Sequence, residues 1–322
     1  MVGPWASEIA SRIPYVDRVL YCSFPWFSRE PKGWLAAPYL QLIDEARNLK
    51  QVGYDCFINL RFDFWWGAML GYFAGIPIRH GYDTPECRPF LNNLQQHRPG
   101  LHQAELNMNL VKAVVKAHQE LSKDLRLEFP ITLEEQVFAQ QWLASRAARR
   151  PLIALHPGAG SPVKLWPAQK YAALGDLLAD RYGGSIIVTG AEWEEPLVRS
   201  IAGQMATEPL TLTGVRLGPL AAVLRACDLV VGADSGILHL AVALGVPTIH
   251  LYGPVSSDSF GPLGNPEMHQ VVHTSLPCAP CNRLDFAPQE LSAHPCIKTI
   301  DVDSVFSRSK SLLEEARLAA RN

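Results

Sequence analysis

Residues 157–164 combine small side chains with a lysine, a combination that suits the binding of a phosphate. The run reads Pro-Gly-Ala-Gly-Ser-Pro-Val-Lys and follows a short apolar segment, Leu152–His156. Small residues let the backbone approach an anion closely, and Lys164 can supply a positive charge. The Walker sequence Gly-Lys-Ser/Thr is absent from the run. A plain turn between a strand and a helix, with a surface lysine, explains the pattern about equally well.

A second loop places an aspartate and a serine directly before an expected helix. Asp234, Ser235 and Gly236 follow a very apolar segment. The first backbone N–H groups of a helix have no partner inside it, so those of Ser235 and Gly236 can bind a phosphate. Asp234 can accept hydrogen bonds from sugar hydroxyls. The alternative, that Asp234 or Ser235 only caps the helix, is compatible with ligand binding.

His239 and an acidic loop give two weaker indications. His239 lies one turn into the same helix and can face the same site, although a lone histidine among apolar residues more often fills a core. The loop Thr189–Glu195 contains three glutamates. One of them can bind a ribose, or all three can simply stabilise the start of the next helix. The pattern by itself favours the second interpretation.

Three cysteines near the end of the chain have a spacing that resembles a zinc site. Cys278 and Cys281 are followed by His294 and Cys296. The group lacks a second tight pair, and its prolines also suit a rigid loop with unreactive thiols. Neither Gly-x-Ser-x-Gly nor His-Glu-x-x-His occurs, so neither a serine hydrolase nor a zinc protease is predicted.

The elements that must position these loops alternate between strands and helices. In the second half we expect strands at 152–156, 185–189, 210–212, 228–231 and 247–251. Helices are expected to begin near residues 166, 193, 219, 235 and 302. The alternation predicts a parallel sheet covered on both faces. Ligands bind at the carboxyl ends of such strands, where the three loops lie.

The first half shows the same alternation less completely. Its expected strands are 18–21, 56–60 and 77–79, and its expected helices are 38–52, 64–73, 103–121 and 133–148. Arg149–Pro151 lies between a helix end and a strand start, which predicts domains 1–150 and 151–322. The last helix, 302–320, is free to pack back on the first domain.

The composition excludes several classes of protein. The 322 residues are 48% hydrophobic and 19% charged, as in ordinary globular chains. The net charge is 29 − 31 = −2 without a basic block, so we expect no nucleic-acid partner. No targeting signal opens the chain, and no uncharged stretch without proline reaches the ~20 residues of a membrane-spanning helix. Seven cysteines without a regular framework indicate a reducing compartment, which predicts a cytoplasmic protein.

Ordered motifs connect the candidate loops. In the second half they are His156–Pro167, Thr189-Gly190-x3-Glu194, Asp234-Ser235-Gly236-x2-His239-Leu240-Ala241, Leu244-Gly245-x-Pro247-Thr248, Tyr252-Gly253-Pro254 and Cys278-Ala279-Pro280-Cys281. In the first half, looser ones lie at 14–19, 55–61, 75–82 and 102–110. Their order and spacing resemble glycosyltransferase family 9, the heptosyltransferase-like enzymes of lipopolysaccharide assembly.

The resemblance implies an α/β fold of the GT-B type, in which two Rossmann-like domains with parallel sheets face each other across a cleft. The second domain would hold a nucleotide-diphosphate sugar, with an ADP-heptose-like donor expected. The resemblance also implies an inverting transfer, without a metal ion or another cofactor, to an envelope glycan such as lipopolysaccharide core. The lipid-linked acceptor would bring the protein to the inner face of the membrane.

The implied donor-site residues are Ser161, Lys164, Glu194, Val215, Asp234, Ser235, Gly236 and His239. By this resemblance, Lys164 and the N–H groups of Ser235 and Gly236 would bind the diphosphate. Glu194 would bind the ribose and Asp234 the transferred sugar. Val215 would present its backbone carbonyl to the nucleotide base, and Ser161 and His239 would line the site.

The chain departs from the family at its start. Family members have a strand, a Gly-Asp loop and a helix before the segment matched here by residues 2–5. That unit supplies the central strand of the first sheet and the aspartate proposed as general base, so we expect an incomplete first domain without an identified base. Asp63, His80 and Glu105 are candidate replacements that no motif supports.

Two other functions remain open at this point. The first is a non-catalytic protein that binds nucleotide sugars, left by loss of the opening unit. The second is a different GT-B enzyme, such as a UDP-sugar epimerase.

Overall fold

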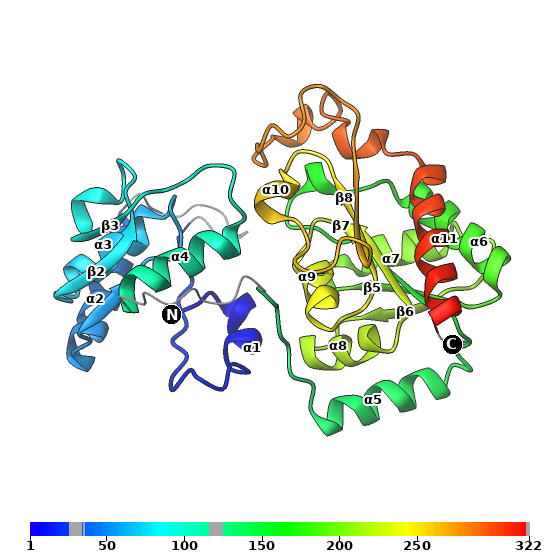
Figure 1. Cartoon of the computed structure of the whole chain (residues 1–322), viewed down its shortest axis with the longest axis horizontal. Coiled ribbons are helices and arrows are strands. Elements are labelled where there is room, and N and C mark those ends of the chain that lie inside the picture. Colours follow the sequence, from blue (N-terminus) through cyan, green and yellow to red (C-terminus); the bar gives the residue numbers. More distant parts are fainter. Residues whose placement is uncertain (26–33, 35, 116–124, 320–322) are drawn as a thin grey trace. The chain divides into compact units, whose positions relative to one another are not determined.

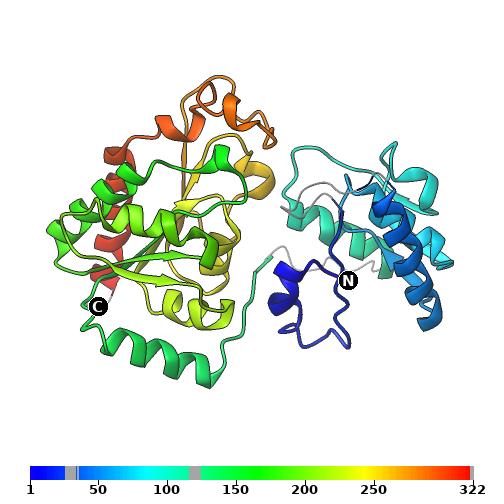
Figure 2. The same ribbon diagram turned by 180° about the vertical axis from the view of Figure 1, so that it is seen from behind.

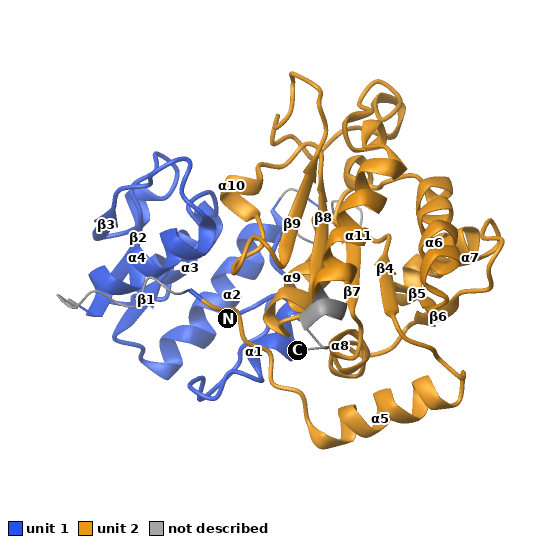
Figure 3. Ribbon diagram, turned by 45° about the vertical axis from the view of Figure 1, so that its right-hand side comes forward, with its two compact units in different colours: residues 1–125 blue, residues 126–322 orange. Residues whose placement is uncertain are grey.

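The computed structural model describes residues 1–25, 34, 36–115 and 125–319. It divides the chain into two compact units, residues 1–125 and 126–322 (Figure 3). Each unit is α/β with a parallel sheet, which confirms the predicted fold class. In the described part of the chain, no helix is long and apolar enough to cross a membrane.

The second unit contains a six-stranded parallel sheet (Figure 1). Its strands are β4 (Leu152–His156), β5 (Ser185–Gly190), β6 (Leu210–Thr213), β7 (Leu229–Ala233), β8 (Thr248–Tyr252) and β9 (His269–His273). They lie in the order β6-β5-β4-β7-β8-β9. Every residue of β4, β7 and β8 is buried, as expected for parallel strands covered on both faces. The first five strands were predicted to within two residues at each end.

Helices cover both faces of this sheet (Figure 1 and Figure 2). Those on one face are α6 (Ala168–Tyr182), α7 (Glu195–Ala202) and α11 (Val302–Ala319), and they share one hydrophobic core with the sheet. Those on the other face are α5 (Leu133–Ala144), α8 (Leu217–Arg225) and α9 (Gly236–Ala243), which enclose a second core. The predicted helix near 193–205 is a short 3-10 turn, η4 (Glu192–Glu194), followed by α7.

Two helices, α5 and α11, pack in the second unit, whereas the sequence suggested that they belong to or pack on the first domain. Helix α5 begins at a capping box between Thr132 and Glu135 and packs against α8. The two units therefore divide before α5 and not at Arg149–Pro151, because α5 shares its core with the second sheet. Helix α11 places Val305 and Leu312 in the core of the second unit and packs along α6.

The first unit has a smaller sheet. Strands β1 (Cys56–Ile58), β2 (Ile78–Tyr82) and β3 (Asn93–Gln95) are parallel and lie in that order. The helices around them are α2 (Ala37–Val52), α3 (Trp65–Phe73) and α4 (Gln103–Val115), preceded by the short α1 (Ser7–Ala10). The expected strand 18–21 is wrong, since only an isolated bridge joins Tyr21 to Val2. Residues 116–121 of one expected helix and residue 320 of another lie outside the described residues.

Candidate functional site

The strand order of the second unit creates a switch point between β4 and β7. From β4 the chain proceeds outward to β5 and β6, and from β7 it proceeds the other way to β8 and β9. In open α/β sheets of this order, ligands bind at the carboxyl ends of the strands beside the switch point. The loop after β4 carries Lys164, in the 3-10 turn η3 (Pro162–Lys164), and the loop after β7 carries Asp234. The fold therefore brings the two strongest candidate loops together.

Lys164 and Asp234 form an ion pair at this point. Lys164 Nζ lies 2.8 Å from Asp234 Oδ2, and the two side chains are only 11% and 12% exposed. Burial raises the pKa of Asp234, but a hydrogen bond from His239 and the charge of Lys164 outweigh it and lower the pKa to about 2. Asp234 is therefore ionised at physiological pH and balances the lysine.

Two further side chains reach the other carboxylate oxygen of Asp234. His239 Nε2 lies 3.5 Å from Oδ1, so the predicted proximity of His239 and Asp234 is present in the structure. The Tyr252 hydroxyl lies 3.4 Å from the same oxygen and 2.6 Å from the Phe260 carbonyl oxygen. Tyr252 was part of a sequence motif without an assigned role. Its position follows from the strand register: Leu251 of β8 lies opposite Ala233 of β7, so the next residues, Tyr252 and Asp234, are neighbours.

Ser235 begins α9 without capping it through its side chain. Its backbone is extended and its side chain makes no cap bond, and its buried hydroxyl oxygen has no hydrogen-bond partner in the part of the chain that the structure describes. A buried hydroxyl without a partner costs free energy, so this position is one where a hydrogen-bonding partner would be stabilising. The first N–H groups of α9, from Gly236 onward, have no acceptor within the helix. Both features place unsatisfied hydrogen-bonding groups next to the Lys164–Asp234 pair.

Glu194 lies against the loop that follows β4. Its Oε2 accepts a hydrogen bond from the Ala191 N–H, 2.9 Å away, at the start of η4. A Cβ atom added to Gly158 would lie 2.2 Å from Glu194 Oε1, so the carboxylate packs directly on this glycine. The two interpretations of this acidic loop are thus compatible: the carboxylate stabilises a helix start and also borders the candidate site.

Ser161 and Val215 have different surroundings. The Ser161 hydroxyl donates a hydrogen bond of 2.7 Å to the Leu284 carbonyl, which ties the loop after β4 to the cysteine-bearing loop. Val215 follows β6 and packs against the core under α8. The hydrogen bonds and ion pairs around Asp234 do not include either residue.

The cysteine-bearing loop holds free thiols. Cys278 and Cys281 are exposed and Cys296 is buried, and with His294 they line a small cavity of about 40 Å³. Among the described residues, no group of three or more histidine, cysteine, aspartate or glutamate side chains is arranged to hold a metal ion.

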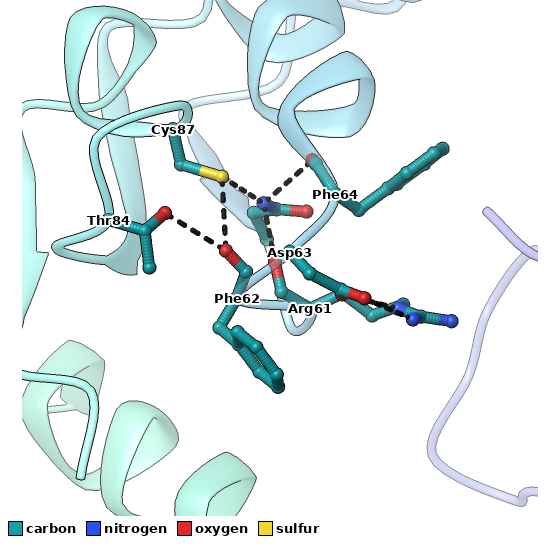
Figure 4. Close-up of polar contacts among 7 residues, drawn as sticks. Arg61, Phe62, Asp63, Phe64, Thr84 and Cys87 are labelled. Atoms are coloured by element: carbon teal, nitrogen blue, oxygen red, sulfur yellow. Dashed lines mark hydrogen bonds and ion pairs between the residues drawn. The ribbon is translucent and has the colours of Figure 1, made fainter. Parts of the chain in front are cut away.

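A second candidate site lies in the first unit, at the carboxyl end of β1. The buried Asn59 amide donates hydrogen bonds to the carbonyls of Arg61 and Phe64, 3.0 and 3.2 Å away (Figure 4). The Thr84 hydroxyl and the Cys87 thiol both donate to the Phe62 carbonyl. These bonds hold residues 59–64 in a fixed turn.

This turn borders a cavity of about 450 Å³. Its walls are mostly aromatic and aliphatic, and Asn59 and Arg61 supply the polar side chains. The lining residues are Met1, Gly3, Trp5, Phe24, Phe57, Ile58, Asn59, Leu60, Arg61, Phe64, Gly67 and Leu70. A cavity with many apolar walls and a few polar groups is typical of a site for a small molecule or part of one.

The three candidate bases of the first unit are not equivalent. Asp63 forms two hydrogen bonds with Arg61, of 2.9 and 2.7 Å (Figure 4). Burial raises the pKa of Asp63, but these bonds and the charge of Arg61 outweigh it, so the net pKa is lowered and the carboxylate is a weak base. His80 lies within β2, and burial lowers its pKa. Glu105 lies in the first turn of α4.

Comparison with known proteins assigns the chain to a family. The sequence profile of glycosyltransferase family 9 (heptosyltransferase) matches residues 43–287. A relative named lipopolysaccharide heptosyltransferase 2, from Escherichia coli, is 26% identical over 276 residues, which are 82% of this chain and 76% of the relative.

Solved structures share the fold. A family 9 glycosyltransferase from Veillonella parvula superimposes with a TM-score of 0.76 at 23% identity, over 97% of this chain and 86% of that one. An E. coli heptosyltransferase solved with ADP-2-deoxy-2-fluoro heptose gives a TM-score of 0.65 at 23% identity, over 98% and 88% of the two chains. The predicted GT-B type of fold is confirmed by these neighbours.

Proposed function

The chain belongs to glycosyltransferase family 9, and we propose that it transfers a heptose from ADP-heptose to a cell-envelope glycan such as lipopolysaccharide core. Two observations on similar proteins support this choice of substrates. The E. coli relative is named a lipopolysaccharide heptosyltransferase, and the E. coli structure was solved with an ADP-linked fluoro-heptose. A lipid-linked acceptor would be met at the inner face of the membrane.

The observation that carries the proposal is the Lys164–Asp234 pair at the switch point. The pair places a cation and a carboxylate, 2.8 Å apart, beside the N-terminus of α9. A departing ADP carries two phosphates, whose charge Lys164 and the N–H groups of Ser235 and Gly236 would stabilise. With these groups the transfer would need no metal ion, and direct attack of the acceptor hydroxyl on the anomeric carbon would invert its configuration.

The remaining donor-site residues would each bind one part of the donor. Asp234 and His239 would bind hydroxyls of the transferred heptose, since they share one hydrogen-bonded cluster. Glu194 would accept hydrogen bonds from the ribose over Gly158. Val215 would offer its backbone carbonyl to adenine, and Ser161 would line the site by holding the Leu284 carbonyl.

The cavity of the first unit would receive the acceptor. Trp5, Phe24 and Phe64 offer apolar faces for sugar rings, and Arg61 offers a charge for an acidic group. An inverting transfer also needs a base for the acceptor hydroxyl. The ion pair of Asp63 with Arg61 makes Asp63 the least suitable of the three candidates.

The test is a transfer assay with the purified chain, ADP-heptose and a lipopolysaccharide-core acceptor. We expect the acceptor mass to increase by one heptose and the new linkage to have the anomeric configuration opposite to that of the donor. Donor binding without product would indicate a protein that only binds nucleotide sugars. Isomerisation of a UDP-sugar without acceptor would indicate an epimerase, and either outcome would refute the proposal.

A further inference from the structure

One buried histidine next to the donor site has no role in the function proposed above. His250 lies in the middle of β8 and is completely buried. Because side chains alternate along a strand, His250 shares its face of the sheet with Thr248 and Tyr252. A core position of this kind normally holds an apolar residue, so a histidine here requires an explanation.

Hydrogen bonds connect His250 to a second buried histidine. Its Nε2 lies 2.9 Å from the Thr248 hydroxyl, and that hydroxyl lies 3.0 Å from Nδ1 of His269. A hydroxyl has one proton, so it donates to one ring and accepts from the other. Nε2 of His250 therefore has a hydrogen-bond partner, whereas its Nδ1 has none among the described residues.

The surroundings keep this imidazole neutral. Burial lowers the pKa of His250 to about 3, and electrostatic interactions with the neighbouring imidazoles of His239 and His269 add to this effect. Burial also lowers the pKa of His269. Among the described residues, the charge that opposes this effect on His250 is that of Asp234, which is already paired with Lys164.

His250 packs near two side chains that reach Asp234. Its ring centroid is 5.6 Å from that of His239 and 6.4 Å from that of Tyr252, with which it stacks at an interplanar angle of 24°. His239 and Tyr252 both reach Asp234 Oδ1. The imidazole therefore neighbours both residues that contact this carboxylate oxygen.

We propose that His250 is a positioning residue for the donor sugar, which holds His239 and Tyr252 around Asp234 as a neutral, hydrogen-bonded ring. This inference rests on the proposed function, in which Asp234 binds the transferred sugar. It predicts that His250 affects recognition of the sugar and not of the nucleotide.

The test compares His250→Leu with His250→Gln in the full chain. Leucine has a similar size but loses the bond to Thr248 and the flat ring, whereas the glutamine amide can restore the bond without a charge. Affinities for ADP and for ADP-2-deoxy-2-fluoro-heptose are measured by calorimetry. We expect His250→Leu to lower the affinity for the sugar nucleotide about 10-fold and the affinity for ADP less than about 3-fold. We expect His250→Gln to recover much of the lost affinity.

Two reference variants make the result specific. Ile249→Ala removes a fully buried side chain from the next position of β8, on the other face. It should destabilise the protein and leave the affinity ratio of the two ligands unchanged. Asp234→Asn should lower the affinity for the sugar nucleotide alone, which shows that the assay detects the sugar contact.

Three results would overturn the inference. The first is that His250→Leu lowers the affinities for both ligands equally, or lowers neither, while Asp234→Asn lowers only the affinity for the sugar nucleotide. In that case His250 only fills the core, and the proposed function stands. If His250→Leu does not fold, the same conclusion follows from a folded His250→Gln variant whose affinities for ADP and for the sugar nucleotide change by the same factor. If the unmodified chain binds neither ligand, the proposed function fails and the inference fails with it.

Discussion

At the scale of single residues, the buried ion pair is the central feature of the proposed donor site. Lys164 and Asp234 are 70 positions apart, and both were predicted as separate ligand contacts. Their direct pairing could not be predicted, because it depends on β4 and β7 lying side by side. The roles of Tyr252 and His250 were also beyond the sequence, since a tyrosine or histidine in an apolar strand normally indicates core packing.

Lys164→Met should destabilise the protein and weaken nucleotide binding. Removing one partner of a buried pair leaves an uncompensated charge, which costs about 3 kcal/mol of unfolding free energy. The loss of a charged contact should make the binding free energy of ADP less favourable by about 1.5–3 kcal/mol. Urea denaturation and calorimetry measure the two effects. As a control, Lys310→Met removes only an exposed pair with Glu314 and should change neither quantity measurably.

Asp234→Asn should lower the affinity for the sugar nucleotide without lowering the affinity for the nucleotide alone. Asp234 balances the charge of Lys164, so removing the charge of Asp234 lets the lysine attract the diphosphate more strongly. ADP affinity should stay the same or increase, while the affinity for ADP-heptose should fall by about 1–3 kcal/mol. Calorimetry without acceptor measures both. Asp176→Asn, which removes a carboxylate that binds the Ala206 and Thr207 N–H groups, is the matched control. An equal loss for both ligands would mean that Asp234 only holds the loop in shape.

At the scale of elements, the strands of the second unit were predictable because they are apolar and regularly spaced. Strand β9, with sequence His-Gln-Val-Val-His, was missed because polar residues make up most of it. In the first unit, β3 has only three residues and no buried one, so nothing in the sequence distinguishes it from a loop. The segment 18–21 has the composition of a strand but pairs with the chain only through one bridge.

The strands of the second sheet contain three buried histidines, His156, His250 and His269, and burial lowers the pKa of each, which should make the protein sensitive to acid. Burial lowers the pKa of His156 to about 4 and that of His250 to about 3. In the unfolded chain both titrate near 6.5, so below that pH the unfolded state binds protons that the folded state does not. Stability should fall as the pH decreases from 6.5 towards 4, by about 1.4 kcal/mol per pH unit for each histidine.

Urea unfolding at pH 6.5, 5.5 and 4.5 measures this slope. His250→Gln should reduce the slope by about 1.4 kcal/mol per pH unit, because one of the titrating histidines is removed. Asp234 does not contribute in this range, since its pKa is lowered from 3.8 to about 2 and its stabilisation is lost only below pH 4. A stability that is constant between pH 6.5 and 4.5 would contradict the neutral, buried state of both rings.

At the scale of the whole molecule, the division into units has a testable consequence. Phe129, Ala139 and Trp142 belong to the core under α8, although they precede the boundary expected from the sequence. That expectation relied on Arg149–Pro151 as a link between a helix and a strand, and the sequence does not indicate which sheet α5 covers.

Residues 126–322 should fold alone and bind ADP, whereas residues 152–322 should be much less stable. The shorter fragment lacks α5 and exposes the apolar face of α8, and the loss of one large buried side chain such as Trp142 already costs about 3–5 kcal/mol. Thermal denaturation and calorimetry of the two fragments measure the difference. Equal stability of the fragments would show that α5 is not part of the second unit.

The central claim is that Lys164 and the start of α9, and not a metal ion, stabilise the departing ADP. The most direct measurement is the rate of heptose transfer from ADP-heptose to a lipopolysaccharide-core acceptor in excess EDTA, for the unmodified chain and for Lys164→Met. We predict full activity of the unmodified chain in EDTA and a loss of at least about 100-fold in the variant, as for other groups that stabilise charge in a transition state. Activity that disappears in EDTA, or that survives in Lys164→Met, would contradict the claim.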